Sequence, residues 1–279
     1  MARPSWAARH IMNPSGSHSE KAKKNPGLLS ARQQQLEEQV DLSHPNWKTR
    51  HIAITMDGNR RWAKAHGFAD LVKGHEAAPV AVRAVVETAA RLGLKGLTLY
   101  AFSRENWSRP RREVSALMRL FRRVVIEERT EMMENNIRFI ASGRLEDIPD
   151  PVRREIDMSR EMTGSNTGLT VNLAVSYSGR EEILDAARAL ARQAAAGALD
   201  PNDITADVFA RHLYAPELGD PDLFIRTSGE HRISNFLLWQ LAYSEIYFTE
   251  VLWPDFRAIH LLEAMVDFQK RQRRFGGSS

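Results

Sequence analysis

The sequence predicts a single α/β domain with a central, mainly parallel β-sheet flanked by helices. From about His51 onward, segments with the patterns of strands and of helices alternate along the chain, and such alternation is typical of a parallel sheet. Polar, glycine-containing loops follow several strands, which is where ligands bind in folds of this class. Hydrophobic residues make up 43% of the 279 positions, enough for one large core.

The first part of the chain has a different composition from the rest. Residues 1–46 are rich in Ser, Lys, Gln, Asn and Pro, and only Leu28 to Val40 shows a weak helical pattern. We therefore expect residues 1–46 to form a disordered or peripheral arm and residues 47–279 to form the folded domain.

The first predicted strand is Ile52 to Asp57, in which Ile52, Ala53, Ile54 and Met56 suit a strand covered on both faces. It ends on an acid followed by Gly58. The strands that follow it in the chain are Gly96–Phe102, Ile137–Ser142, Leu169–Val175 and Leu223–Thr227.

The predicted helices carry apolar side chains at helical spacing. Helix Glu113–Asn135 has one apolar stripe that suits a core-facing helix. Helix His75–Leu92 is rich in alanine, which permits either tight packing of a neighbouring helix or a tunnel beside it, and Pro79 in a first turn would place its start near Glu76. The other expected elements are helices Pro151–Thr163, Gly179–Ala196, Thr205–His212 and Asp255–Arg271, with an apolar stretch over Phe236–Phe248.

Composition limits the chemistry and the compartment. The chain contains no cysteine, so a metal would be held by carboxylates or histidines, and disulfides are excluded. No apolar run reaches bilayer length and no signal sequence is evident, so a cytoplasmic location is expected. The net charge of +4 favours an anionic partner. Because the distinctive arginines cluster at strand ends instead of over a face with aromatic platforms, we do not expect nucleic-acid binding.

The first strand leads into a loop suited to phosphate. Gly58 allows a turn that points backbone N–H groups at one place, and a helix opening at Asn59 would add its own free N–H groups. Asp57 would then lie where a metal-bridged diphosphate needs a carboxylate, since magnesium takes only one or two from the protein. The alternative is an ordinary strand-to-turn Asp-Gly with solvated arginines.

A second anion site is predicted after strand Leu223–Thr227. Arg226, Arg232 and Ser234 surround another glycine-containing turn, and guanidinium groups match phosphate oxygens in pairs. The alternative is a surface ion pair between Arg226 and Glu230. Further along, Glu245 lies in an apolar run, where a carboxylate needs either a buried arginine or a metal.

Four long stretches, taken together and in order, resemble the cis-prenyltransferases, the family of undecaprenyl diphosphate synthase. The resemblance extends from about His51 to Gly277. It implies a homodimer with a parallel sheet and a hydrophobic tunnel for the growing chain, and it implies isoprenoid diphosphate substrates and Mg²⁺ as cofactor. The stretches are Met56-Asp-Gly-Asn-Arg-Arg-Trp-Ala63, Leu99-Tyr-Ala-Phe-Ser-Arg-Glu-Asn-Trp-Ser-Arg-Pro110, Arg226-Thr-Ser-Gly-Glu-His-Arg-Ile-Ser-Asn-Phe-Leu-Leu-Trp-Gln240 and Val251-Leu-Trp-Pro-Asp-Phe256, with Gly74-His75 between the first two.

The resemblance also assigns roles to residues of the first loop. Asp57 is implied as the magnesium-linked residue for ionisation of the allylic diphosphate. Residues implied to bind that diphosphate are Gly58, Asn59, Arg60, Arg61 and Arg109.

The remaining roles concern the second diphosphate and the reacting region. Arg226, Arg232 and Ser234 are implied to bind the second diphosphate, with Glu245 helping to hold magnesium there. His75, Ser103 and Asn106 are implied to line the reacting region together with Asn59 and Asp57, and Trp62 and Trp107 to wall it. Arg274-Phe275-Gly276 resembles the segment that reaches the partner subunit's site.

Some positions depart from the family pattern and indicate a specialised member. Leu71 stands where many members have an arginine, with Lys73 as a candidate substitute, and Ser176 and Ser178 replace the usual Asn and Gly around Tyr177. We expect a short product, with two alternatives left open: irregular head-to-middle coupling of two allylic diphosphates to a lavandulyl-type skeleton, and long-chain undecaprenyl diphosphate synthesis. Membrane contact is expected to be peripheral at most, through the product.

A different class, a non-catalytic prenyltransferase subunit, would keep the fold and lose the acid and the arginines. This chain retains Asp57, Arg226 and Arg232, which disfavours that class.

Overall fold

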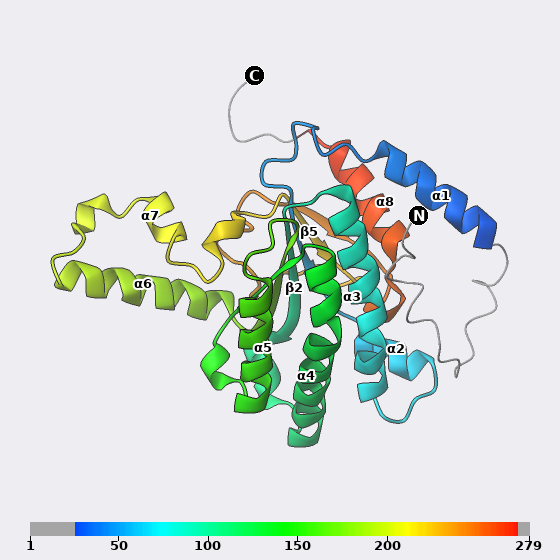
Figure 1. Ribbon diagram of the computed structural model, residues 1–279, viewed down its shortest axis with the longest axis horizontal. Helices are drawn as coiled ribbons and strands as arrows, with labels where there is room; N and C mark the ends of the chain where they lie inside the picture. The colour runs from blue at the N-terminus through cyan, green and yellow to red at the C-terminus, as the bar shows by residue number, and fades with distance from the viewer. Residues whose placement is uncertain (1–25, 273–279) are drawn as a thin grey trace.

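The computed structural model describes residues 26–272 and places a six-stranded parallel sheet at the centre of the molecule (Figure 1). The strand order is β3-β4-β2-β1-β5-β6, and every neighbouring pair is parallel. The strands are β1 (His51–Thr55), β2 (Gly96–Ser103), β3 (Arg138–Ser142), β4 (Thr170–Tyr177), β5 (Leu223–Arg226) and β6 (Glu245–Phe248). The predicted fold class is confirmed.

One face of the sheet is covered by α3 (Val72–Leu92), α4 (Arg111–Glu134), α5 (Asp150–Thr163) and α8 (Ala258–Gln269). The first three lie side by side across the sheet (Figure 1). Their apolar side chains pack with those of the strands in the larger core. The apolar stripe over Glu113–Asn135 predicted this position for α4. The smaller core on the other face is formed by Tyr177, Phe224 and Phe236 with their neighbours.

The helix that follows β4 leaves the body of the molecule. In Figure 1, α6 (Gly179–Ala195) and α7 (Ala206–Ala210) extend away from the sheet, so the second face is covered mainly by residues of the segment 233–241 and by Tyr214. Parallel sheets are normally covered on both faces. Large apolar side chains are exposed in the covering segment, at Trp239, and on β6, at Ile246.

The N-terminal part of the described chain packs against the end of the fold. Helix α1 (Pro26–Gln39) lies along α8, where Arg32 forms an ion pair with Glu263 at 2.7 Å. Asn46 is buried and donates to the carbonyl oxygen of Phe268 at 3.0 Å. These contacts join the segment to α8, while residues 1–25 lie outside the described residues, and the arm over residues 1–46 with its boundary stays a prediction.

Helix α3 begins earlier than the sequence predicted. The expected start near Glu76 is wrong, because the helix opens at Val72 and carries Pro79 in its interior. Pro79 has no N–H to donate to the carbonyl of His75, four residues earlier, so the helix continues with one hydrogen bond missing. Packing of the flanking turns against the sheet outweighs that loss, since Ala81, Val85 and Ala89 are fully buried.

Candidate active site

Two loops meet at the carboxyl ends of β1 and β5, which are adjacent in the sheet. The register pairs Thr55 with Arg226, so the residues that follow each strand emerge side by side. Asp57 lies two residues after the end of β1, and its backbone N–H donates to the hydroxyl of Thr227 at 2.9 Å. This hydrogen bond joins the loop after β1 to the loop after β5. The two loops meet at one edge of the sheet, as the sequence predicted.

Gly58 makes the turn out of β1 possible. Its φ of +100° is in the left-handed region, and a Cβ there would come within 2.9 Å of Leu252 and Ser228 side-chain atoms. Helix α2 (Asn59–Ala65) opens immediately afterwards, as predicted. The backbone N–H of Gly58 donates to Asp57 Oδ1 at 2.7 Å, which orients the carboxylate.

Asp57 forms an ion pair with the buried Arg226. Arg226 Nη2 donates to Asp57 Oδ2 at 2.9 Å, and the arginine side chain is 4% exposed while that of the aspartate is 34% exposed. Arg226 Nη1 donates to Ser234 Oγ at 2.7 Å and to the carbonyl of Arg232 at 2.5 Å. The alternative of a surface pair between Arg226 and Glu230 is therefore wrong, because the guanidinium is buried and turned toward Asp57.

These side chains line an open hollow of about 550 Å³. Arg61 donates to Ser228 Oγ at 2.6 Å, and Arg109 pairs with Glu113 at 3.2 Å, so both guanidinium groups are held in place. The cationic character suits a diphosphate, which arginine binds through paired hydrogen bonds. Predicted residues that line it are Asp57, Gly58, Asn59, Arg60, Arg61, His75, Ser103, Asn106, Arg109, Arg226 and Ser234.

His75 faces this hollow as a neutral imidazole. Burial, and then the positive charges of Arg109 and Arg60, lower its pKa to about 4. Its Nε2 atom is buried and has no hydrogen-bond partner among residues 26–272, and the same is true of Asn59 Oδ1. Buried polar atoms normally have partners, so these two atoms fit contacts with a ligand in the hollow.

The position of His75 depends on close contact between α2 and α3. Gly74 precedes it, and a Cβ on Gly74 would lie 1.8 Å from the backbone oxygen of Asn59. Only glycine fits this approach, which brings Asn59 and His75 to the same wall of the hollow.

Two predicted site residues, Trp62 and Arg232, do not line the hollow. Trp62 donates to Asp255 Oδ1 at 2.9 Å and stacks on His66, so it does not wall the hollow. Arg232 is exposed and pairs with Glu230. Of the other expectations, Trp107 packs on Phe102 behind the hollow, and Arg274-Phe275-Gly276 lies outside the described residues.

Glu245 is not brought to Asp57 within one chain. It pairs with Leu223 in the register, at the amino ends of β5 and β6, three residues before the end that carries the hollow. Its Oε2 accepts a hydrogen bond from Arg271 at 3.0 Å. A carboxylate in an apolar run needs either an arginine or a metal as its partner, and in this chain the partner is Arg271.

Lys73 does not line the hollow. Its ammonium group pairs with Glu76 at 2.8 Å, and its substitution for the arginine missing at Leu71 stays a prediction. Leu71 instead borders a second hollow of about 460 Å³ beside Arg60 and Arg112.

The sequence analysis missed Asn235, which ties three loops of the site together. Its Nδ2 donates to Glu105 Oε1 at 2.9 Å and to Ser178 Oγ at 2.8 Å, and its Oδ1 accepts from the N–H of Arg180 at 3.0 Å. The φ of Asn235 is +60°, a conformation that asparagine tolerates better than most residues. The sequence feature that could have identified Asn235 is its position directly after Ser234, a predicted site residue.

A parallel sheet whose strand-end loops gather arginines around one carboxylate defines a class of enzymes for phosphorylated substrates. Comparison with known proteins identifies the class further. The undecaprenyl diphosphate synthase family model (Prenyltransf) matches residues 55–276. The chain belongs to this family, the cis-prenyltransferases, as its motifs predicted.

Individual relatives cover most of the chain. An isoprenyl transferase of Chlorobaculum tepidum is 51% identical over 82% of this chain and 86% of its own length. The ditrans,polycis-undecaprenyl-diphosphate synthase ((2E,6E)-farnesyl-diphosphate specific) of Vibrio cholerae is 49% identical over 81% of this chain and 90% of its own. Lavandulyl diphosphate synthase from Lavandula x intermedia, solved with dimethylallyl diphosphate, superposes with a TM-score of 0.80 at 37% identity, covering 85% of this chain and 100% of that one.

Proposed function

We propose that this chain is a Mg²⁺-dependent prenyltransferase that joins an allylic diphosphate, such as dimethylallyl or geranyl diphosphate, to a second C5 diphosphate and releases diphosphate. The observation that carries the proposal is the partly exposed carboxylate of Asp57, which contacts the buried Arg226 in a hollow lined by Arg60, Arg61 and Arg109. Ionising an allylic diphosphate requires its leaving charge to be neutralised by fixed positive groups.

The reaction divides into steps that the hollow can serve. The C–O bond of the allylic diphosphate breaks and its electron pair leaves with the diphosphate, which Arg60, Arg61 and Arg109 would hold. The allylic carbon then bonds to the terminal alkene carbon of the second substrate, whose diphosphate Arg226 and Ser234 would hold. This leaves a positive charge on the other alkene carbon, and loss of a proton from the CH2 group next to that carbon forms the new double bond. In its N–H tautomer, the neutral His75 can donate to a diphosphate oxygen without adding charge.

Magnesium fits the donor set. Asp57 is the carboxylate of the first loop, and Mg²⁺ is commonly held by one or two carboxylates together with substrate phosphates and water. No group of three or more His, Asp or Glu side chains suited to a metal occurs within residues 26–272, so the substrate would supply the remaining ligands. When bound, the ion would neutralise charge on the leaving diphosphate.

A short product is the first candidate, based on the altered positions Leu71, Ser176 and Ser178. Two observations favour other products. The likeness to lavandulyl diphosphate synthase favours irregular coupling of two allylic molecules, and the 49% identity with the Vibrio cholerae enzyme favours a long chain.

The homodimer and the location also belong to this proposal. Strand β6 is an edge strand whose Ile246 is 37% exposed, and Trp239 in the segment 233–241 is 36% exposed, which suits an interface with a second copy. No helix within residues 26–272 is long and apolar enough to cross a membrane. We infer a cytoplasmic enzyme that meets membranes at most peripherally, through its product, and binds no nucleic acid.

The test is incubation of purified enzyme and Mg²⁺ with dimethylallyl, geranyl or farnesyl diphosphate, each with and without isopentenyl diphosphate. We expect products of a few isoprene units that require isopentenyl diphosphate, identified by mass and branching. Product formed without isopentenyl diphosphate would establish irregular coupling, and products of about ten units or more would establish the long-chain alternative. Absence of any prenyl product from all mixtures would overturn the proposal.

A further inference from the structure

The segment 234–237, which follows the loop after β5, has an unusual backbone conformation. Ser234, Asn235 and Leu237 have φ angles of +49°, +60° and +45°, in a region that few residues other than glycine adopt. Ser234 is also the residue whose Oγ accepts from Arg226. Because such a conformation persists only where surrounding contacts enforce it, the position of the Ser234 hydroxyl depends on what holds this segment.

Asn235 supplies these contacts. Its Nδ2 atom carries two hydrogens, which are donated to Ser178 Oγ at 2.8 Å and to Glu105 Oε1 at 2.9 Å. Its Oδ1 accepts from the N–H of Arg180 at 3.0 Å, and its backbone carbonyl accepts from the N–H of Gly179 at 2.8 Å. Both donor hydrogens and both oxygens are thus engaged, which fixes the side chain and the backbone of Asn235 together.

The partners of Asn235 come from the beginning of α6. Ser178 is 4% exposed and has an extended backbone, with φ −150° and ψ 123°, so a serine is accommodated there without strain. A Cβ on Gly179 would lie 2.9 Å from the backbone oxygen of Asn235, so α6 begins in direct contact with the segment. Ser178 therefore gives the Asn235 amide a fixed, buried acceptor.

These contacts lie on the side of the hollow that is proposed to bind the second diphosphate. Asn235 and Ser234 both line the hollow. Arg60 and Arg61, which are proposed to hold the first diphosphate, belong to α2, and none of the hydrogen bonds of Asn235 described above reaches them. A change at Asn235 should therefore affect one diphosphate more than the other.

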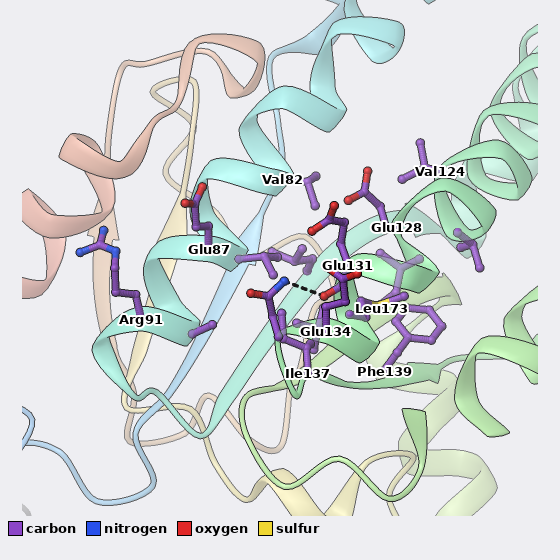
Figure 2. Close-up of a pocket in the computed structure, with 17 residues that line it drawn as sticks. Val82, Glu87, Arg91, Val124, Glu128, Glu131, Glu134, Ile137, Phe139 and Leu173 are labelled. Atoms are coloured by element: carbon purple, nitrogen blue, oxygen red, sulfur yellow. Dashed lines mark hydrogen bonds between the residues drawn. The ribbon is translucent and has the colours of Figure 1, made fainter. Parts of the chain in front are cut away.

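We propose that Asn235 and Ser178 are positioning residues for the second diphosphate substrate. They hold the left-handed backbone at Ser234, so that its hydroxyl and Arg226 stay together, and they thereby set the affinity for that substrate. The inference rests on the proposed prenyl transfer and goes beyond it, since neither residue was assigned a part in binding. Neither lines the apolar cavity of about 490 Å³ between α3, α4 and the sheet (Figure 2), so that cavity should be unchanged in their variants.

The test uses Asn235→Asp, which is nearly isosteric and tolerates the same backbone conformation. It keeps the acceptor for Arg180 but loses both donated hydrogen bonds. We expect the KM for isopentenyl diphosphate to rise about tenfold or more, as loss of a hydrogen bond to a charged group does. The KM for geranyl diphosphate and kcat should change less than about threefold, because the interactions with the first diphosphate remain. Isothermal titration of the full chain with isopentenyl diphosphate alone measures the same loss of affinity without turnover.

Ser178 provides a second variant and a rescue. Ser178→Ala removes the acceptor and should raise the KM for isopentenyl diphosphate in the same direction, whereas Ser178→Thr keeps a hydroxyl and should restore it. This pair also gives the comparison if Asn235→Asp does not fold.

Asn136→Asp is the matched control. Asn136 has a φ of +55°, its Nδ2 donates to Thr167 Oγ1 at 3.2 Å, its backbone carbonyl accepts from the N–H of Gly168 at 3.1 Å, and it does not line the hollow. Its substitution should lower stability in chemical denaturation and leave both KM values unchanged.

The outcomes separate this inference from the proposed function. An unchanged KM for isopentenyl diphosphate in a folded Asn235→Asp, or an equal rise in both KM values, would overturn the inference alone. A wild type without prenyl products would instead overturn the proposed function on which the inference rests.

Discussion

At the scale of single residues, Asp57 and Arg226 carry the proposed chemistry, because they join the two loops of the site through one ion pair. We predict that Asp57→Asn lowers turnover about 100-fold or more, as loss of a charge that stabilises a developing ion commonly does. The amide oxygen can still accept from the N–H of Gly58, so the fold should survive. Steady-state kinetics and far-UV circular dichroism test both parts, and near-normal turnover would remove Asp57 from the mechanism.

The residues of the site were predictable where a strand end places them. Asp57 lies just after, and Arg226 at the end of, strands that the apolar pattern identified, and neighbouring parallel strands end on the same edge. The partner of Glu245 was not predictable, because an acid in an apolar run indicates only that a partner exists, and Arg271 is distant in the sequence. The contacts of Trp62 were not predictable either, because the direction of a side chain on a short helix depends on tertiary contacts. The roles of both residues toward metal and substrate stay predictions.

At the scale of elements, the approach of α2 to α3 has a direct test in Gly74. We predict that Gly74→Ala destabilises the protein by about 1–3 kcal/mol, as overpacking of a close contact does, and impairs activity by moving His75 relative to Asn59. Chemical denaturation and kinetics measure the two effects.

Gly93→Ala is the control for this change. Gly93 has a φ of +85° but nothing within 4 Å of an added Cβ, so the substitution should cost about 1–2 kcal/mol of backbone strain and leave activity intact. Equal activity of the two variants would show that the contact of α2 with α3 does not position the site.

Strand β1 introduces a dependence of stability on pH. His51 is 3% exposed, contacts Thr98 Oγ1 and the carbonyl of Gly219, and has its pKa lowered to about 4, chiefly by burial. In the unfolded chain, the His51 imidazole takes up a proton near pH 6.5, whereas in the folded protein it does so only near pH 4. The free energy of unfolding that His51 contributes above pH 6.5 is therefore lost as the pH falls toward 4.

From His51 alone we expect about 2 kcal/mol less stability at pH 5 than at pH 7. Urea denaturation of wild type and His51→Gln at both values tests this, with the variant showing the smaller change. An equal change in both proteins would assign the effect to other groups, such as His75, whose pKa is lowered in the same direction.

Helix α3 shows the limit of sequence patterns at this scale. A proline predicts the start of a helix when only local propensity is considered. The observed start at Val72, two turns before Pro79, follows from packing against the sheet, which the local sequence does not specify.

At the scale of the whole molecule, the edge at β6 is the expected interface of the homodimer. We predict that Ile246→Lys, which places a charge on this partly exposed strand, converts the protein from a dimer into a monomer of 31.7 kDa. Light scattering with size-exclusion chromatography measures the mass.

Met162→Lys provides the comparison for this variant. Met162 is an exposed apolar residue of α5, on the helix-covered face of the sheet, so its substitution should leave the dimer intact. A monomeric wild type, or dimers of both variants, would place the interface elsewhere or remove it.

The architecture followed from alternation of strand and helix patterns, but the strand order did not. The position of β1 between β2 and β5 depends on which helices cover the sheet, and this is decided by the packing of entire faces. The sequence predicted α6 as a helix but not that it projects from the sheet. Helical periodicity indicates an apolar face, but it does not show which part of the protein that face contacts.

With the roles proposed above, the bond between Arg226 and Asp57 would also link the binding of the two substrates thermodynamically. An anion that binds Arg226 would weaken its ion pair with Asp57, and a cation that binds Asp57 would weaken the same pair. Binding at either residue would therefore change the electrostatic environment of the other. Linkage requires that each ligand change the affinity of the other by an equal factor. Titration of one diphosphate in the presence and absence of a non-reactive analogue of the other would give that factor in both directions, and it would disappear in Asp57→Asn.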